Sequence, residues 1–158
     1  MPPYFVDFEA FQHGEERFHI KELCIIDVDN PLKPVYFLFK ADKNWHGLSD
    51  CVKQTYNFQT NNLHQLAWNE GETRYCRRCV QYCVETIFPL CRNGIFYVMG
   101  TQKLKYLQDQ FPKWNFAEYM ILMKDLPLLP PNIGCIYRAH GEHCACLKCY
   151  QLVKHYLP

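Results

Sequence analysis

The sequence is poor in several features on which common protein classes depend. It has one serine, Ser49, and no Gly-x-Ser-x-Gly segment, which argues against a serine hydrolase because that class holds its nucleophile on such a turn. Glycine is scarce, with 7 residues against 10 prolines, and no glycine-rich loop is present to cradle a phosphate. No window approaches the roughly 18–20 apolar residues of a membrane span, so we expect no membrane partner.

Charge of one sign is also lacking, because Lys+Arg 17 and Asp+Glu 16 leave a formal net charge of +1. This balance excludes a strongly basic nucleic-acid coat and an acidic tail, although a local basic face remains compatible with it. What is present is apolar: 49% of the 158 residues are hydrophobic and 16% are aromatic. Length and composition together predict one globular domain over residues 1–158.

The first residues carry no positively charged stretch and reach Asp7 early, which is unlike a secretory signal peptide. We therefore expect an intracellular protein, cytoplasmic or nuclear, whose 10 cysteines are reduced. In that setting, cysteines are more often small buried hydrophobic residues or metal ligands than members of disulfides. An exported protein stapled by disulfides is the alternative.

The order of apolar patterns predicts an α/β fold. Runs at 4–8, 18–28 and 35–39 predict three strands in an antiparallel meander, because short connections join them. Residues 41–74 are polar and predict irregular structure with one short helix near 63–68. After that point we expect helices over 75–88, from Thr101 to Phe111 and over 143–156, and strands at 95–99, 116–120 and 133–137. Such an order suits a mixed sheet with a parallel half and helices on its faces.

Asp7-Phe8-Glu9 on the first predicted strand is a candidate metal site. Residues i and i+2 of a strand point to the same side, so both carboxylates face one way. Two hard oxygen ligands on one face can hold Mg²⁺ or Mn²⁺, as two-metal phosphoryl chemistry requires. The alternative is a pair of surface acids on an edge strand.

A second candidate site is the cysteine- and histidine-rich run near the end of the chain. Cys135, His140 and Cys144 lie around a short glycine-containing turn, and thiolate and imidazole are the ligands that Zn²⁺ prefers in tetrahedral sites. Cys146 and Cys149 are predicted to pack as core residues of the last helix.

Cys76-Arg77-Arg78-Cys79 is a Cys-x-x-Cys pair, which raises the question of a zinc or redox site. Its cysteines continue with Cys83 at helical spacing, so we interpret all three as part of an apolar, core-facing stripe.

These segments together resemble the DnaQ-like exonuclease superfamily, within the RNase H-like folds, and most closely the Maelstrom domain. Tyr4 to Glu9 resembles the first exonuclease strand, Lys21 to Ile26 the second, and Ile95 to Gly100 the fourth. His143 to Lys148 stands where exonucleases carry His-x-Ala-x-x-Asp. The resemblance implies an RNase H-like mixed sheet with the three-strand meander and flanking helices.

The resemblance also implies a catalytic set, which this chain matches in part. Asp7 and Glu9 would hold Mg²⁺ or Mn²⁺, and His143 would be the general base. The final carboxylate position is Lys148, a cation that would repel a metal ion. The nearest candidate for the middle carboxylate is Asp109, which we expect on the outer face of its helix.

Maelstrom domains keep a Glu, Cys, His, Cys set that holds zinc, and the resemblance assigns it here to Glu22, Cys135, His140 and Cys144. His143 and Cys149 are alternatives for the fourth position, and Glu22 has the alternative of being a surface acid. Zinc would be structural, joining the second strand to the last helix.

Two functions stay open from the sequence, besides a plain α/β domain with a thiol-rich core and no metal. One is a module that binds single-stranded RNA or DNA, with or without metal-dependent nuclease activity, in which exposed Tyr or Trp side chains stack on bases. The other is a catalytically inactive, zinc-stabilised adaptor that binds RNA or a protein partner. Phosphate contacts are expected from basic residues on the predicted helices: Arg77, Arg78, Lys103 and Lys105.

Overall fold

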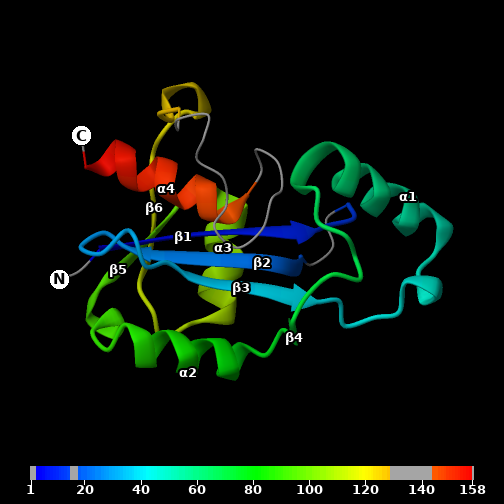
Figure 1. The fold of residues 1–158 in the computed structure, drawn as a ribbon, viewed down its shortest axis with the longest axis horizontal. Coiled ribbons are helices and arrows are strands. Elements are labelled where there is room, and N and C mark those ends of the chain that lie inside the picture. Colours follow the sequence, from blue (N-terminus) through cyan, green and yellow to red (C-terminus); the bar gives the residue numbers. More distant parts are fainter. Residues whose placement is uncertain (1–2, 15–17, 129–143, 158) are drawn as a thin grey trace.

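The computed structural model describes residues 3–14, 18–128 and 144–157, and over them the chain is an α/β fold with a six-stranded mixed sheet (Figure 1). Residues 133–137, for which we predict a strand, lie outside the described residues. The strands are β1 (Pro3–Phe11), β2 (His19–Asp27), β3 (Val35–Lys40), β4 (Thr73–Arg74), β5 (Ile95–Val98) and β6 (Phe116–Glu118).

The sheet has the order β4-β3-β2-β1-β5-β6. Strand β1 pairs with β2, and β2 with β3, in antiparallel fashion, while β5 is parallel to β1 and β6 is parallel to β5. Among the described strands β2 alone therefore runs opposite to the others, since β4 is parallel to β3. The predicted three-strand meander and the parallel half of the sheet are confirmed.

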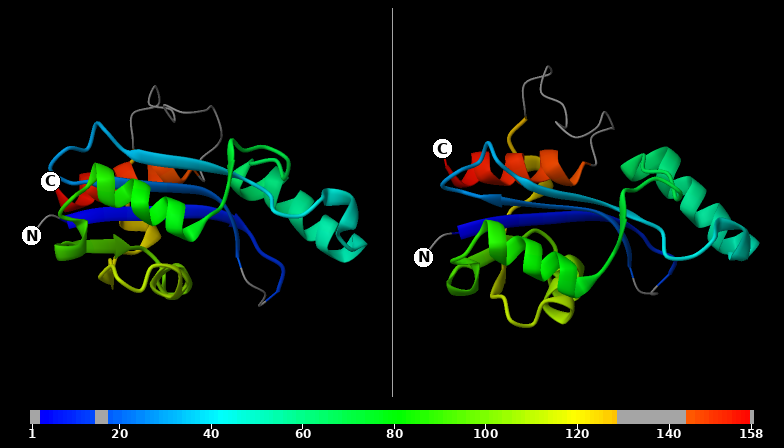
Figure 2. Two further views of the ribbon diagram at one scale, coloured as in Figure 1. Left: turned by 90° about the horizontal axis from the view of Figure 1, so that it is seen from below. Right: turned by 60° about the horizontal axis from the view of Figure 1, so that its bottom comes forward.

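Four helices accompany the sheet: α1 (Asp50–Gln59), α2 (Arg77–Ile87), α3 (Thr101–Gln110) and α4 (Ala145–Tyr156). Helix α4 covers one face of the sheet, and α2 and α3 cover the other (Figure 2). Helix α1 projects beyond the end of the sheet where β1 finishes (Figure 1). The central strands are thus covered on both faces, while α1 belongs to a separate excursion between β3 and β4.

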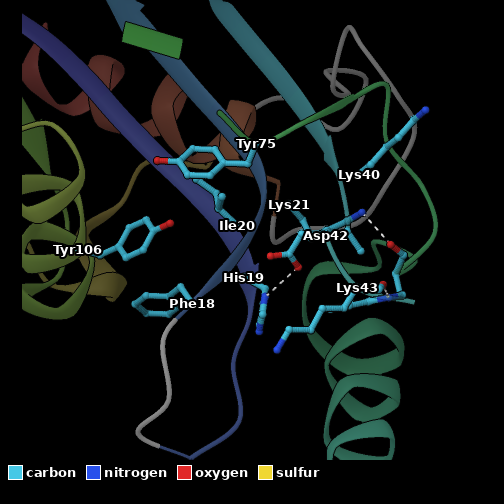
Figure 3. Close-up of a pocket in the computed structure, with 11 residues that line it drawn as sticks. Phe18, His19, Ile20, Lys21, Lys40, Asp42, Lys43, Tyr75 and Tyr106 are labelled. Carbon is cyan, nitrogen blue, oxygen red and sulfur yellow. Dashed lines mark hydrogen bonds and ion pairs between the residues drawn. The ribbon is translucent and has the colours of Figure 1, made fainter. Parts of the chain in front are cut away.

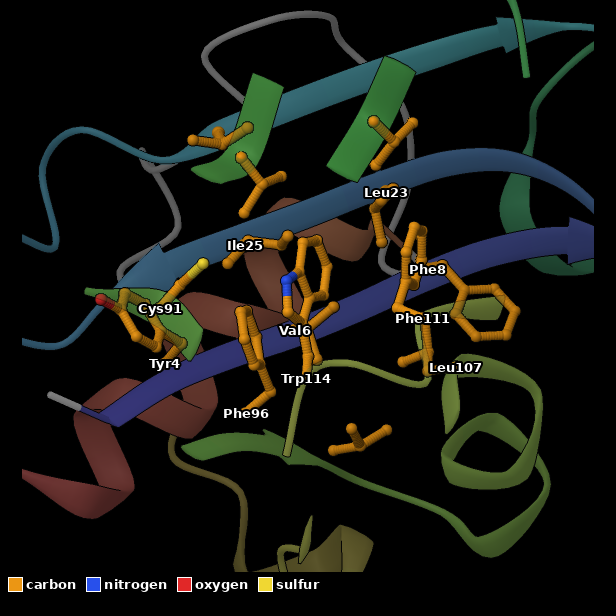
Figure 4. Packing of buried hydrophobic residues seen from close by; sticks show 14 of the residues in the cluster. Tyr4, Val6, Phe8, Leu23, Ile25, Cys91, Phe96, Leu107, Phe111 and Trp114 are labelled. Atoms are coloured by element: carbon orange, nitrogen blue, oxygen red, sulfur yellow. The ribbon is translucent and has the colours of Figure 1, made fainter. Parts of the chain in front are cut away.

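Strand β1 has apolar residues on both faces because it lies in the middle of this sandwich. Tyr4, Val6 and Phe8 point into the core beneath α2 and α3, which Figure 4 shows filled with aromatic and aliphatic side chains. Phe5 points to the opposite core beneath α4, together with Cys149. Because successive side chains alternate, Asp7 also lies on the α4 face.

Helix α2 buries only part of the apolar face that its spacing predicts, because that face includes valines as well as cysteines. Its core residues are Val80 and Val84, whereas Cys79 is exposed and Cys76 and Cys83 are half-buried. Cys79 and Cys83 directly precede the two valines, and one residue of an α-helix corresponds to a rotation of about 100°. These cysteines therefore lie on the flank of the helix, beside the buried valines. The prediction that Cys79 packs in the core is wrong.

Helix α1 stands in the segment for which we predict irregular structure. Only Tyr56 of its ten residues is buried, so the apolar periodicity that identifies a helix is nearly absent. The signal that was available is Ser49, the single serine of the chain, whose hydroxyl accepts a hydrogen bond from the Val52 N–H at 3.3 Å and caps the helix. A short π-helical turn follows at Thr60–His64.

Two contacts hold the segment that follows the π-helical turn against β2 and β3. The buried ammonium of Lys21 donates to the carbonyl oxygens of Phe39 at 2.7 Å and Trp68 at 3.0 Å, and also to that of Glu70. Gly71 then passes against β3 so closely that a Cβ atom would lie 2.3 Å from the Phe39 carbonyl carbon. Only glycine fits there, and its φ of +141° is also unfavourable for other residues.

Candidate functional site

Three acidic residues come together on the sheet face that α4 covers. Asp7 and Glu9 lie on β1 and Glu22 lies on β2, where it is the register partner of Glu9. The face is shared because strand side chains alternate. Asp7 and Glu22 are almost completely buried, with 1% and 0% exposure. The sequence-based expectation that Asp7 and Glu9 face one way is consistent with this register.

A lysine from α3 occupies the space beside Asp7. Lys103 Nζ lies 2.7 Å from Asp7 Oδ1 and donates to the Phe8 carbonyl oxygen at 2.7 Å, with the Phe8 ring centroid 5.2 Å away. Burial acts to lower the pKa of Lys103, but the charges of Asp7 and Glu9 outweigh it and raise that pKa. Burial raises the pKa of Asp7, and Lys103 opposes that rise. The arrangement is therefore a buried ion pair.

Glu9 is a partly buried acid in a crowded anionic environment. Burial is the main cause that raises its pKa to about 8, and the nearby charges of Asp7 and Glu22 add to the rise while those of Lys103 and Lys148 oppose it. Burial therefore favours the neutral form of the Glu9 carboxyl.

Glu22 caps the last helix from a distance. Its Oε1 atom accepts a hydrogen bond from the Ala145 N–H at 2.7 Å, and its Oε2 atom accepts one from the Tyr36 hydroxyl. The N-cap residue, Cys144, makes no side-chain cap hydrogen bond, so the carboxylate satisfies an N–H group that the helix leaves open. A negative charge at this end also interacts favourably with the helix dipole.

We expect Glu22→Gln to lower the free energy of unfolding by about 2 kcal/mol, because a hydrogen bond to a charged group contributes about 1.5–3 kcal/mol. The glutamine amide oxygen can accept only one of the two bonds with full strength. Urea unfolding measures the loss, and hydrogen exchange of the first turn of α4 should accelerate. Glu72→Gln, at an exposed position, is the matched control. Equal unfolding free energies for both variants would contradict the capping role.

Glu22 and Cys144 are the two predicted zinc ligands that the structure describes; Cys144 is the N-cap of α4, and the Glu22 carboxylate reaches from β2 to the first N–H group of that helix. Cys144 is fully buried. Cys135 and His140 lie outside the described residues, as does His143. Within residues 3–14, 18–128 and 144–157 there is no group of three or more His, Cys, Asp or Glu side chains placed to hold a metal ion, so the zinc set stays a prediction. Cys146 and Cys149 are buried residues of α4 that pack in the core, as predicted.

Mg²⁺ or Mn²⁺ fits this face poorly in the arrangement described. One oxygen of Asp7 is bound to the Lys103 ammonium group, and Lys148 adds positive charge that reaches Asp7 and Glu9. Asp109, the candidate for a middle carboxylate, is exposed on the outer face of α3 as we expect. Two lysines thus stand where a metal-dependent site would need further acids.

A groove of about 490 Å³ opens at the same end of the sheet, on the side of α3 (Figure 3). Phe18, Tyr75 and Tyr106 form its aromatic side, and Tyr106 packs edge-on against Phe18 with their ring centroids 5.5 Å apart. Lys40 and Lys43 lie on the other side and are exposed. Between the two sides, His19 Nδ1 lies 3.6 Å from Asp42 Oδ1.

The groove brings aromatic and basic side chains together. Phe18, Tyr75 and Tyr106 are half-buried and pack against the core, so their exposed parts supply aromatic surface, and the lysines at the rim supply positive charge that can contact phosphates. Sequence reasoning missed these residues because they come from four separate segments. The only available signal was the density of aromatic and basic residues between 36 and 45 and near 75.

The basic residues that we predict as phosphate contacts are dispersed. Lys103 is committed to Asp7, whereas Lys105 is exposed on α3. Arg77 and Arg78 line a separate hollow of about 520 Å³ with Lys113. The predicted residues therefore do not form one continuous basic face.

No known family model and no curated protein sequence matches this chain. In the described part of the chain, no helix is long and apolar enough to cross a membrane. Its own geometry is therefore the basis for a functional proposal.

Proposed function

We propose that this chain is an RNase H-like domain that binds single-stranded nucleic acid without cleaving it. The observation that carries the absence of cleavage is the Lys103 ammonium, 2.7 Å from Asp7 Oδ1. It occupies the position beside the first acid of the strand where a catalytic cation would otherwise sit. A fixed positive charge there also repels a divalent metal ion.

The sheet supports the RNase H-like assignment. A three-strand meander, followed by parallel strands on the other side of β1, is the layout that the resemblance implies, and β2 is the single reversed strand of those described. The position of α4 over β1 and β2 agrees with a last helix that reaches the Asp7-x-Glu9 pair. Lys148 on that helix adds a second positive charge near both acids.

The groove beside α3 supports binding of a single strand. Its aromatic side can stack bases whatever their sequence, and its lysine rim can follow the phosphates. The groove opens on the face opposite α4, so occupation by nucleic acid does not depend on the Asp7–Lys103 pair. Binding and cleavage are therefore separable by experiment.

The test is fluorescence anisotropy of labelled oligouridylate and oligothymidylate at several salt concentrations. We expect Lys40→Ala/Lys43→Ala to weaken binding about tenfold and to reduce the slope of log K against log salt by about 1.4, because each phosphate contact on a single strand contributes about 0.7. Lys33→Ala/Lys154→Ala removes the same charge from exposed positions elsewhere and should bind as the wild type does. Equal affinities of the two variants would exclude the groove.

A metal-dependent nuclease is the second candidate, and one observation favours it: Asp7 Oδ2 is buried and has no hydrogen-bond partner among the described residues. The same oligonucleotides incubated with Mg²⁺ or Mn²⁺ decide between the two. We expect them to remain full length. Cleavage by the wild type that is lost in Asp7→Asn would overturn the proposal in favour of the nuclease.

A further inference from the structure

Cys76 and Cys79 form an accessible pair of thiols at the start of α2. Cys76 is the N-cap of the helix, and its Sγ atom accepts a hydrogen bond from the Cys79 N–H at 3.4 Å. Cys79 is exposed and Cys76 is half-buried, while the core face of this helix is made by Val80 and Val84. Packing in the core therefore does not account for the presence of cysteine at both positions.

The two thiols of this pair have different environments. The N–H groups at the beginning of a helix and its dipole stabilise negative charge, and Cys76 stands at that point with Arg77 and Arg78 directly after it. Hydrogen bonds from the Cys79 thiol and from backbone N–H groups lower the pKa of Cys76. The same contact with Cys76 raises the pKa of Cys79. Cys76 is therefore suited to attack an incoming disulfide as a thiolate, and Cys79 is suited to attack the resulting mixed disulfide in a second step.

The geometry also allows the two sulfurs to join. A disulfide needs Cβ atoms about 3.5–4.5 Å apart, and side chains three residues apart on a helix have Cβ atoms about 5–6 Å apart. Cys76 is the N-cap, with extended backbone (φ −134°, ψ 111°), so a small local adjustment at the helix start closes this difference. The hydrogen bond between Cys76 Sγ and the Cys79 backbone already directs the first sulfur toward the second residue.

We propose that Cys76 and Cys79 form a thiol–disulfide exchange site, which reduces a small-molecule disulfide of the oxidised-glutathione type. The Cys76 thiolate attacks one sulfur of the incoming disulfide, forms a mixed disulfide and releases the first leaving thiolate, which takes up a proton. The Cys79 thiol then loses its proton and attacks Cys76 Sγ, which releases the second thiol. The incoming disulfide gains two electrons, and the protein loses two as the Cys76–Cys79 disulfide forms.

Oxidised glutathione is the probe for this site. The folded full chain is incubated with it, quenched with acid, alkylated and analysed by intact mass and peptide mapping. We expect the wild type to lose two hydrogens, with the new disulfide mapped to Cys76–Cys79. In Cys79→Ser we expect the reaction to stop at one glutathionyl group on Cys76. In Cys76→Ser, reaction at Cys79 should be at least about tenfold slower, because the stabilised thiolate is gone.

Cys83→Ser is the matched control, because Cys83 lies on the same flank of α2, outside the pair, and is half-buried. It should react as the wild type does. Circular dichroism checks that each variant is folded, since both substituted positions of the pair are at the helix start and away from the core. The inference is overturned if the wild type retains glutathione on Cys76, if the disulfide maps to other cysteines, or if Cys76→Ser reacts at the wild-type rate.

Discussion

Replacing Lys103 with methionine should lower the free energy of unfolding by about 3 kcal/mol at pH 7. Removing one partner of a buried ion pair costs about 3–5 kcal/mol, and the lower end applies because the Lys103 side chain is 28% exposed. Without the ammonium, the Asp7 carboxyl either remains charged without a partner or takes up a proton. Both states are less favourable than the pair, which also includes the bond to the Phe8 carbonyl oxygen.

Chemical denaturation of Lys103→Met and of Lys105→Met separates this effect from a general effect of α3. Lys105 lies on the same helix but is exposed, so its replacement should change stability by less than about 0.5 kcal/mol. The difference between Lys103→Met and the wild type should shrink as the pH falls, because protonation of Asp7 removes the unpaired charge. An undiminished loss at low pH, or an equal loss in both variants, would contradict the ion-pair explanation.

Glu9→Gln should stabilise the protein in alkaline solution. The pKa of Glu9 is raised from 4.5 to about 8 in the folded chain, so the folded state binds a proton that the unfolded state releases between these values. Folding stability therefore falls as the pH rises from 4.5 to 8. A tenfold difference in proton affinity between the two states corresponds to about 1.4 kcal/mol. Partial solvent access of Glu9 reduces this free-energy difference. We therefore expect the ionised Glu9 carboxyl to lower the free energy of unfolding at pH 9 by about 3 kcal/mol.

Unfolding free energies measured from pH 4.5 to pH 9 check this sign. The wild type should lose stability across the range, and Glu9→Gln should lose less, so that the variant is the more stable protein at pH 9. Glu72→Gln is the control, because Glu72 is exposed. A wild type whose stability rises with pH over this range, with no effect of Glu9→Gln on the slope, would show that Glu9 is not a neutral buried acid.

Local patterns in the sequence predict most of the sheet and three of the helices. Alternation and apolar runs locate β1, β2 and β3, and the step of three and four residues locates α3 and α4. Helix α1 was missed because one residue of ten is buried, so its stability comes from capping and from contacts at one end rather than from an apolar stripe. On α2 the cysteines and the valines both recur at intervals of three or four residues. The pattern alone therefore does not show which of the two sets faces the sheet.

The candidate site depends on pairs that are remote in the sequence, and these could not be predicted. Lys103 meets Asp7 across 96 residues, and nothing local distinguishes it from Lys105 two positions later. The bond from Ala145 to Glu22 spans 123 residues. What the sequence did predict was the strand spacing of Asp7 and Glu9, because that follows from strand geometry alone.

The remote cap of α4 has a consequence for the order in which this chain is made. Glu22 leaves the ribosome early, whereas the Ala145 N–H that it binds is synthesised 123 residues later. During that interval β1 and β2 can pair, but one side of the sheet is uncovered and Glu22 can have its bond from Tyr36 but not yet the one from Ala145. Among the described residues, α4 supplies most of the cover on this face, so nascent chains of this protein pass through a long stage in which an apolar face is open to chaperones or to other nascent chains.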